Sequence, residues 1–219
     1  MKHVFNFIFI MTLGIVTASG QISINTNTGG GGLFMDGYFD NYLCGYQVFA
    51  GGEITNTINW VEGLSIGVGL ESQYGQISFY DLLRESTSGQ NFHDHPVDKS
   101  EKLRHRIFTL DVPFRIRYNA FGFMGIMAGL RTSFLLDGYV LTPSKGIKSR
   151  NSTYERIVPV GEVGLFFSLG EKFSVVTKAS KALKDRFFNE YYIDANGNKV
   201  GVGVYADYTF TMSLEYRWK

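Results

Sequence analysis

Acidic and basic side chains recur at every second position along several apolar segments of this 219-residue chain. Such positions share one face of a β-strand, because successive side chains of a strand point to opposite sides. Carboxylates and guanidinium groups on one shared face can pair, and arginine can bind two carboxylates with its planar fork. The six acids and five bases predicted to meet in this way are Glu71, Asp111, Arg115, Arg117, Arg131, Asp137, Glu162, Lys178, Asp207, Glu215 and Arg217.

Residues that could support catalysis or metal binding are few. The segment His93-Asp94-His95 contains common metal ligands, but the three residues are adjacent in one long loop and lack a fourth ligand. His105 has Ser100 and Glu101 close in sequence, a combination that would suit a nucleophilic enzyme at a barrel rim. We predict no catalytic residue, no cofactor and no metal. The main alternative to a protein without catalysis is a membrane enzyme, active at the rim of a β-barrel, that modifies lipid A or cleaves peptides.

The end of the chain shows the strand pattern most clearly. In residues 204–218 apolar side chains at even positions alternate with mostly polar ones at odd positions, and residues 108–118 repeat the pattern. A helix would scatter both sets around its circumference. Together with these two, the predicted strands are 64–76, 122–138, 157–169 and, from weaker patterns, 173–184, 43–54 and 31–40.

The connections between these strands alternate in length. Those at about 55–63, 119–121 and 170–172 are short, whereas those at about 82–104, 141–155 and 185–202 are long and polar. Short periplasmic turns and long outer loops are typical of outer-membrane barrels, and an even strand count brings both termini to one side. The sequence therefore predicts an all-β fold, an eight-stranded antiparallel up-and-down transmembrane β-barrel, with N- and C-termini periplasmic.

Composition decides which face of the strands is turned to lipid. Aromatic residues make up 16% of the chain and charged residues 19%, against about 25% charged in a typical soluble domain. The apolar faces are bulky and aromatic, whereas the opposite faces hold glycine, serine, threonine and charges, which fit a narrow interior. We therefore expect the apolar faces to contact lipid in the cell outer membrane. The alternative is a soluble lipocalin-like ligand carrier with the two faces reversed.

Charge and cysteine content exclude other classes of protein. The formal net charge is +1 and the basic residues are scattered, so the sequence predicts no nucleic-acid partner. The single cysteine, Cys44, excludes a disulfide scaffold and a cysteine-based zinc site.

The N-terminus has the pattern of a secretory signal. Lys2 and His3 precede an apolar run at 4–16, and small residues follow before Gln21. The run is shorter than the roughly 20 residues that a membrane-spanning helix needs. We predict a signal peptide at 1–20, a flexible glycine-rich segment at 21–30 and the barrel domain at 31–219.

The barrel prediction carries three further expectations. The inward charges should form a salt-bridged plug, so that the protein is not an open porin. Pro113 should mark a bulge and Pro159 a frayed rim, because proline forfeits a ladder hydrogen bond. Aromatic girdles are expected from Tyr118, Phe167, Phe173, Tyr216 and Trp218 at one end, and from Phe108 and Phe134 at the other.

The last long loop offers a binding surface. Its rings Phe187, Phe188, Tyr191 and Tyr192 could contact a partner, since aromatic residues are enriched at interface hot spots. They could also extend the barrel as a hairpin with Asn196-Gly197 as its turn. We favour the hairpin, which does not exclude binding.

One hairpin resembles a known family. The segment Leu110–Tyr118, LDVPFRIRY, and the segment Gly125–Leu136 that follows a tight turn are similar to the central hairpin of the PorT-like outer-membrane β-barrel family, common in Bacteroidota. The resemblance implies a small barrel with a signal peptide, assembled by the barrel-insertion machinery, and some members are tied to secretion or gliding. The expected role is structural, adhesive or accessory to secretion, with outer-membrane lipid and a surface or secretion-system protein as partners.

Overall fold

The computed structural model describes residues 21–37, 43–80, 102–142, 146–149, 155–184, 190–193, 199–202 and 204–218. Eight long strands lie within these residues: β1 (Ile22–Gly37), β2 (Leu43–Thr57), β3 (Leu64–Tyr80), β4 (Lys102–Asn119), β5 (Met124–Thr142), β7 (Ile157–Leu169), β8 (Phe173–Ala182) and β11 (Val204–Trp218). Three short strands accompany them: β6 (Gly146–Ser149), β9 (Glu190–Ile193) and β10 (Lys199–Val202).

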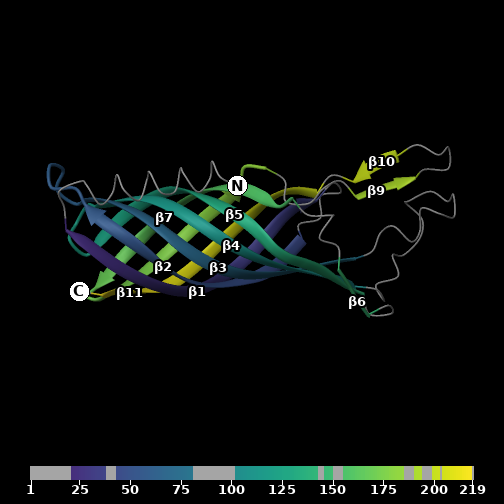
Figure 1. The fold of residues 1–219 in the computed structure, drawn as a ribbon, viewed down its shortest axis with the longest axis horizontal. Helices are drawn as coiled ribbons and strands as arrows, with labels where there is room; N and C mark the ends of the chain where they lie inside the picture. Colours follow the sequence, from purple (N-terminus) through teal and green to yellow (C-terminus); the bar gives the residue numbers. More distant parts are fainter. Residues whose placement is uncertain are drawn as a thin grey trace.

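The eight long strands form a closed barrel. Each pairs antiparallel with the long strand before and after it in the chain, and β1 pairs with β11 to close the sheet. Figure 1 shows the strands tilted along an elongated tube. The predicted eight-stranded antiparallel up-and-down barrel is confirmed.

The two ends of the barrel differ in their connections. At the turn end, which holds Trp218, three tight turns link β2 to β3, β4 to β5 and β7 to β8. Each turn contains a glycine with positive φ, at Gly63 (78°), Gly122 (71°) and Gly170 (81°), a backbone conformation that favours glycine. At the opposite, loop end, β6 pairs with β5, and β9 pairs with β10 (Figure 1).

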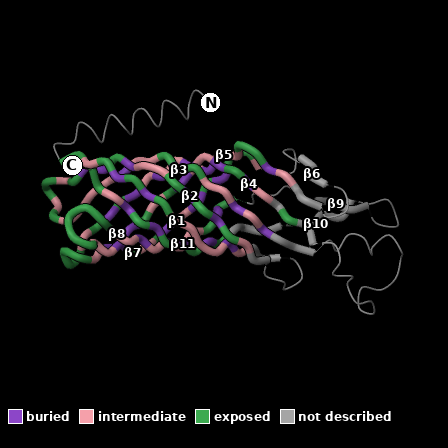
Figure 2. Tube along the Cα trace, turned by 90° about the horizontal axis from the view of Figure 1, so that it is seen from below, coloured by how far each residue is buried: buried purple, intermediate pink, exposed green. Residues whose placement is uncertain are grey.

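Side chains alternate between the lumen and the exterior along the strands. Figure 2 shows the resulting alternation of buried and exposed positions around the tube. Bulky apolar side chains stand on the exterior, among them Val48, Leu70, Ile116, Ile126, Leu130, Val163, Phe210, Met212 and Leu214. Most of the described charged side chains near mid-strand are buried in the lumen.

The lumen itself is layered along its axis. The middle and the turn half hold the charged side chains, with Met127, Phe166 and Val176 packed together on one side. The inward positions nearest the loop end are instead apolar: Leu33, Ile77, Ile107, Val158, Val160 and Ala182. The expectation of a largely polar interior therefore holds for only part of the lumen.

The predicted flexible segment at 21–30 is wrong, because β1 already begins at Ile22. Its polar residues are inward-facing strand residues: Asn25, for example, is buried and donates a hydrogen bond to Thr55. Its glycines fit a close approach of two strands, since a Cβ on Gly31 would overlap the carbonyl oxygen of Phe210 in β11. Glycine content here reflects packing rather than chain flexibility.

The predicted bulge at Pro113 is also wrong. The β3–β4 register is the same on both sides of Pro113, whose ring is buried and would lie 3.1 Å from a Cβ on Gly69. At Pro159 the pairing with β5 continues to Ile157, and the Pro159 carbonyl accepts a hydrogen bond from the Leu183 N–H. Pro113 thus interrupts the β3–β4 ladder without shifting its register, and Pro159 lies within the β5–β7 ladder.

Aromatic side chains contact one another at both ends of the exterior. At the turn end, ring centroids are 5.1 Å apart for Phe173 and Tyr216 and 4.8 Å for Tyr216 and Trp218. At the loop end a longer series runs across β2 to β5, through Tyr46, Tyr74, Phe108 and Tyr139. The sequence analysis placed Phe108 in this series but not its three tyrosines.

Candidate functional site: the charged lumen

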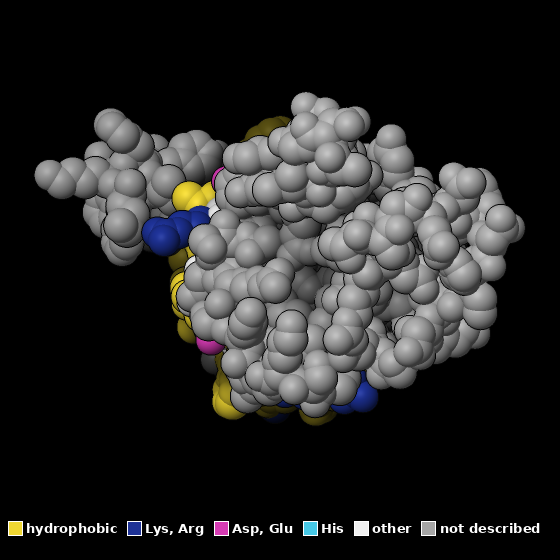
Figure 3. All heavy atoms as spheres, turned by 90° about the vertical axis from the view of Figure 1, so that its right-hand side faces the viewer, with side chains coloured by type: hydrophobic (Ala, Val, Ile, Leu, Met, Phe, Trp, Pro, Cys, Tyr) yellow, Lys and Arg dark blue, Asp and Glu magenta, His cyan; other side chains and the backbone are white. Residues whose placement is uncertain are grey.

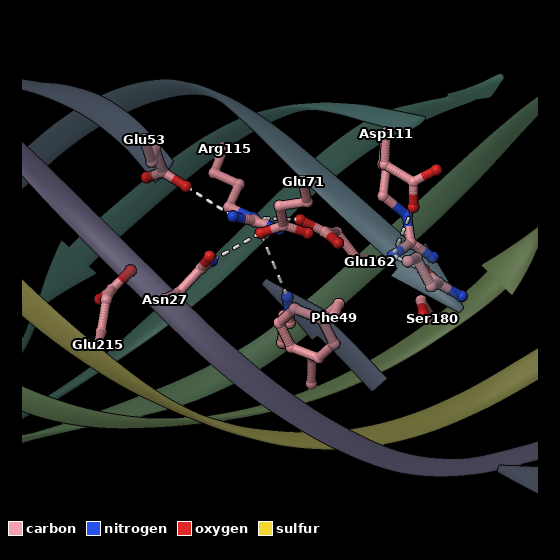
Figure 4. A network of polar contacts seen from close by, with 12 residues as sticks. Asn27, Phe49, Glu53, Glu71, Asp111, Arg115, Glu162, Ser180 and Glu215 are labelled. Carbon is pink, nitrogen blue, oxygen red and sulfur yellow. Dashed lines mark hydrogen bonds and ion pairs between the residues drawn. The ribbon is translucent and has the colours of Figure 1, made fainter. Parts of the chain in front are cut away.

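Arg115 of β4 lies at the centre of the charged lumen. Its Nη1, Nη2 and Nε atoms lie 2.6, 2.7 and 2.5 Å from carboxylate oxygens of Glu53, Glu71 and Glu162, respectively. All four side chains are about 1% exposed, and Figure 4 shows the three carboxylates around the guanidinium group. Because the glutamates come from β2, β3 and β7, one arginine joins four strands across the bore.

Arg117 extends this cluster toward the turn end. It donates two hydrogen bonds to Glu215 of β11, at 2.6 and 2.7 Å, in the two-pronged geometry that suits a guanidinium and a carboxylate. Its Nη2 also lies 3.0 Å from Glu53 Oε1. Glu53 therefore links the two arginines into one continuous network.

Lys178 of β8 approaches the same carboxylate oxygen as Arg115. Its Nζ is 3.8 Å from Glu71 Oε1 and 4.4 Å from the centroid of the inward-facing Phe49 ring. Asn27 of β1 donates a hydrogen bond of 2.7 Å to the same oxygen of Glu71. Together with Arg115, these contacts bring strands β1, β3, β4 and β8 to a single carboxylate.

Toward the loop end the polar contacts include neutral side chains as well as charged ones. Arg131 Nη1 lies 3.3 Å from Asp111 and donates to Gln73 at 3.2 Å, and Gln73 in turn donates to Gln47 at 2.5 Å. Beside Arg131 lies a cavity of about 20 Å³, also lined by Thr109. This volume is close to that of a single water molecule and far below that of a ligand pocket.

Together these charged residues form what we call the lumen charge network. Among the described residues, five carboxylates face four cations in it: Glu53, Glu71, Asp111, Glu162 and Glu215 against Arg115, Arg117, Arg131 and Lys178. The acids are surrounded by bases, an arrangement that fixes strands relative to one another.

Comparison with known proteins identifies the fold. No protein-family model matches the chain, and no curated protein matches it either. Among solved structures, Neisserial surface protein A (NspA) is 8% identical with a TM-score of 0.53, covering 90% of this chain and 99% of its own. The fold is that of a small outer-membrane β-barrel.

Two further solved structures match with lower TM-scores. The Yersinia pestis attachment invasion locus protein Ail is 10% identical with a TM-score of 0.38, covering 91% of this chain and 99% of Ail. The Escherichia coli outer-membrane protease OmpT is 11% identical with a TM-score of 0.31, covering 92% of this chain and 98% of OmpT. Scores at this level carry no argument about activity.

The structure places most of the predicted charged residues in the lumen. Glu71, Asp111, Arg115, Arg117, Arg131, Glu162, Lys178 and Glu215 are all buried there. Arg217 lies near the end of β11 at the turn end, and its side chain is exposed. Asp207 belongs to β11, but its side chain lies outside the described residues.

The prediction that Asp137 faces the lumen is wrong. The register between β4 and β5 shifts beside Phe108, so that Phe108 pairs with Asp137 while Thr109 pairs with Leu135. The extra residue, Leu136, forms a bulge that reverses the alternation beyond it. Asp137 therefore stands on the exterior beside outward-facing Phe108, and its side chain is exposed.

The sequence analysis missed Glu53, which contacts both central arginines. The signal was present, because Gln47, Phe49 and Glu53 alternate with Val48 and Ile54 along β2. Two glycines and an inward-facing phenylalanine obscured which side of this strand was polar.

The other predicted catalytic, metal-binding and partner-binding residues lie largely outside the described residues. His93-Asp94-His95, Ser100, Glu101, Phe187 and Phe188 are not among the described residues, and for His105, Tyr191 and Tyr192 only the strand backbone is described. Among the described residues no three metal-ligating side chains are grouped to hold an ion. In the same residues no helix has the length and apolar character needed to span a bilayer.

Proposed function

We propose that the chain is an outer-membrane protein whose sealed barrel holds its loop end at the cell surface, in a structural, adhesive or accessory secretion role without catalysis. The observation that carries this proposal is the lumen charge network, in which Arg115 binds three carboxylates from three other strands. We expect a bore crossed by such contacts to block the passage of ions. The apolar side chains Ile77, Ile107 and Val158 fill it again toward the loop end.

The exterior supports residence in a membrane. Leu130, Phe210 and Met212 are each about 60% exposed at mid-strand, between the two groups of aromatic rings. Exposed apolar surface of this extent suits hydrocarbon and is unfavourable in water. A soluble ligand carrier would need the reverse orientation, with the apolar faces lining the interior, whereas these faces are exposed on the barrel exterior.

The proposal includes an orientation and a route of assembly. A signal peptide at 1–20 would direct export, and the barrel-insertion machinery would assemble the barrel with the turn end and both termini periplasmic. The long connections and β9–β10 would then lie outside the cell. The LDVPFRIRY hairpin, which contains Arg115 and Arg117, supports membership of the PorT-like family as part of this proposal.

A surface or secretion-system protein is the proposed partner at the loop end. The paired strands β9 and β10 support the hairpin extension proposed for residues 185–202. Trimming residues 187–198 should reduce surface binding or secretion without unfolding the barrel. Unchanged binding and secretion in the trimmed protein would remove the partner from the proposal.

Planar-bilayer recording tests the sealed barrel directly. We expect the purified protein to insert without large, stable single-channel steps, because charged and apolar contacts fill the bore in succession. Steady steps of uniform size would contradict the proposal. For the enzyme alternative, a change in lipid A acylation or peptide cleavage on His105→Ala would favour catalysis instead.

A further inference from the structure

The exterior of β4 changes abruptly from charged to apolar near the loop end. Arg104, Arg106 and Phe108 share the outward face of this strand, and apolar positions such as Ile116 follow toward the turn end. Arg104 is exposed and Arg106 is partly exposed. Two guanidinium groups therefore stand directly above the apolar band, at the level where a bilayer's headgroups would lie.

Aromatic rings form a continuous strip just below these arginines. The centroid of Phe108 is 4.8 Å from that of Tyr74 on β3 and 6.3 Å from that of Tyr139 on β5. Tyr46 on β2 continues the strip, 6.2 Å from Tyr74. Aromatic rings of this kind favour the boundary between hydrocarbon and headgroups.

Arg106 is held in place by the two neighbouring strands. Its Nε donates a hydrogen bond of 2.9 Å to Oε1 of Gln76 on β3, and its guanidinium lies 5.9 Å from the Tyr139 ring centroid. The Tyr74 hydroxyl contacts the same oxygen of Gln76 at 3.4 Å. A guanidinium fixed through Nε keeps its terminal N–H groups in the fork geometry that matches a phosphate.

The local charge favours an anion. Among the described residues of this β4 rim patch, defined as Arg104, Arg106, Gln76, Tyr74, Phe108 and Tyr139, all charges are positive. Asp137, paired opposite Phe108, is the adjacent carboxylate, and it accepts a hydrogen bond from the Gly138 N–H. Figure 3 shows basic, acidic and hydrophobic side chains at the margin of the loop end.

We propose that the β4 rim patch binds the phosphate-bearing headgroup of a lipid in the outer leaflet. Arg104 and Arg106 would contact the phosphate, and the rings of Tyr74, Phe108 and Tyr139 would contact the lipid's apolar part. A lipid is favoured over free phosphate because the charged and aromatic groups adjoin on one bilayer-facing surface. This inference rests on the proposed outer-membrane location and orientation.

Lipid binding by the purified protein tests the proposal. The protein in neutral detergent micelles would be titrated with phosphatidic acid or with phosphatidylcholine, and bound lipid would be counted by native mass spectrometry. We expect the wild type to prefer phosphatidic acid. Replacing both arginines, in Arg104→Gln/Arg106→Gln, should weaken this binding about 30-fold, since each basic residue near a membrane surface contributes roughly fivefold.

Lys184 provides a matched control at the same end of the barrel. It is exposed like Arg104, but its Nζ already lies 2.8 Å from Glu155. Lys184→Gln should therefore bind phosphatidic acid like the wild type. Arg106→Lys, which keeps the charge but loses the fork, should fall between the wild type and the double variant.

Three results would overturn the proposal. The first is equal binding of phosphatidic acid and phosphatidylcholine by the wild type. The second is unchanged binding of phosphatidic acid by the double variant, when gel mobility shows that its barrel is folded. The third is displacement of the bound lipid by an equal concentration of inorganic phosphate. A protein that inserts into bilayers and stays sealed but shows any of these results would retain its proposed function. Failure to insert at all would instead contradict the proposed function.

Discussion

Two regions of the lumen fill the same bore with opposite chemistry. Around Arg115 the filling is ionic, and each guanidinium nitrogen faces a particular carboxylate oxygen. Near the loop end it is apolar, with Ile77 and Val158 fully buried. Ion pairs are directional and specify which strands lie opposite one another, whereas apolar packing mainly excludes water. Both regions therefore close the bore, whereas only the ionic region also specifies which strands lie opposite one another.

The two regions should also differ in how they respond to damage. A buried ion pair contributes little net stability when intact, but removal of one partner leaves an uncompensated charge away from water. Removal of buried methyl groups instead costs the lost packing plus the cavity left behind. The predictions below use this difference, in order of decreasing expected effect.

Arg115→Met should have the largest effect. It leaves Glu53, Glu71 and Glu162 without their shared base, and loss of one partner of a buried ion cluster typically costs about 3–5 kcal/mol. The free energy of unfolding in urea, measured in lipid vesicles, would show this loss. Lys184→Met, at an exposed ion pair outside the lumen, is the control and should change stability by less than about 1 kcal/mol. Equal values for the two variants would contradict the ionic description of the lumen.

Ile77→Ala should have the next largest effect. The side chain is fully buried in the apolar region, and such truncations cost about 2–3 kcal/mol where the surroundings relax in part. Planar-bilayer recording should still show no conductance, because the lumen charge network remains intact. A conducting Ile77→Ala barrel would show that the apolar region alone closes the bore.

Arg117 and Glu215 should be energetically coupled. Their two hydrogen bonds join β4 to β11 across the lumen, and contacting buried residues typically show interaction energies of about 0.5–3 kcal/mol. A double-mutant cycle with Arg117→Met and Glu215→Gln measures this term from unfolding free energies. Strict additivity of the two single changes would mean that the pair adds no coupling.

Asp137→Asn should have the smallest effect. Its carboxylate is exposed beyond the β5 bulge, so stability should stay within about 0.5 kcal/mol of the wild type. Asp111→Asn, on the same β-hairpin but buried near Arg131, should cost about 1–3 kcal/mol. The two variants compared by urea unfolding would separate an exterior aspartate from a lumen aspartate. A similar loss for both would place Asp137 back in the lumen.

The barrel and most of the charged lumen could be predicted because strand alternation leaves a regular pattern in the sequence. Arg115, Arg117 and Glu162 occupy regular alternating positions, and the structure buries all three in the lumen. Long-range pairing partners were not predictable in the same way. That Glu53 and Glu71 both meet Arg115 depends on the register of three strands, which sequence spacing alone does not fix.

The errors arose where one residue changes a strand's geometry. A single extra residue at Leu136 reverses the faces beyond it and moves Asp137 outside. In β1 the composition resembled a flexible linker, but Gly31 is required there by close contact with β11. Pro113 is accommodated next to Gly69 without a register shift, which depends on a neighbour distant in sequence. In each case the deciding contact is between strands rather than within one.

The orientation of the barrel wall is the central claim, and spin-label accessibility in lipid vesicles tests it most directly. With Cys44 replaced by serine, a label at Met212→Cys, outward and about 60% exposed at mid-strand, should be relaxed strongly by oxygen and weakly by a water-soluble nickel chelate. A label at Arg104→Cys, above the apolar band, should show the opposite preference. Equal access of the nickel chelate to both positions would mean that water surrounds the barrel, and the account would be contradicted.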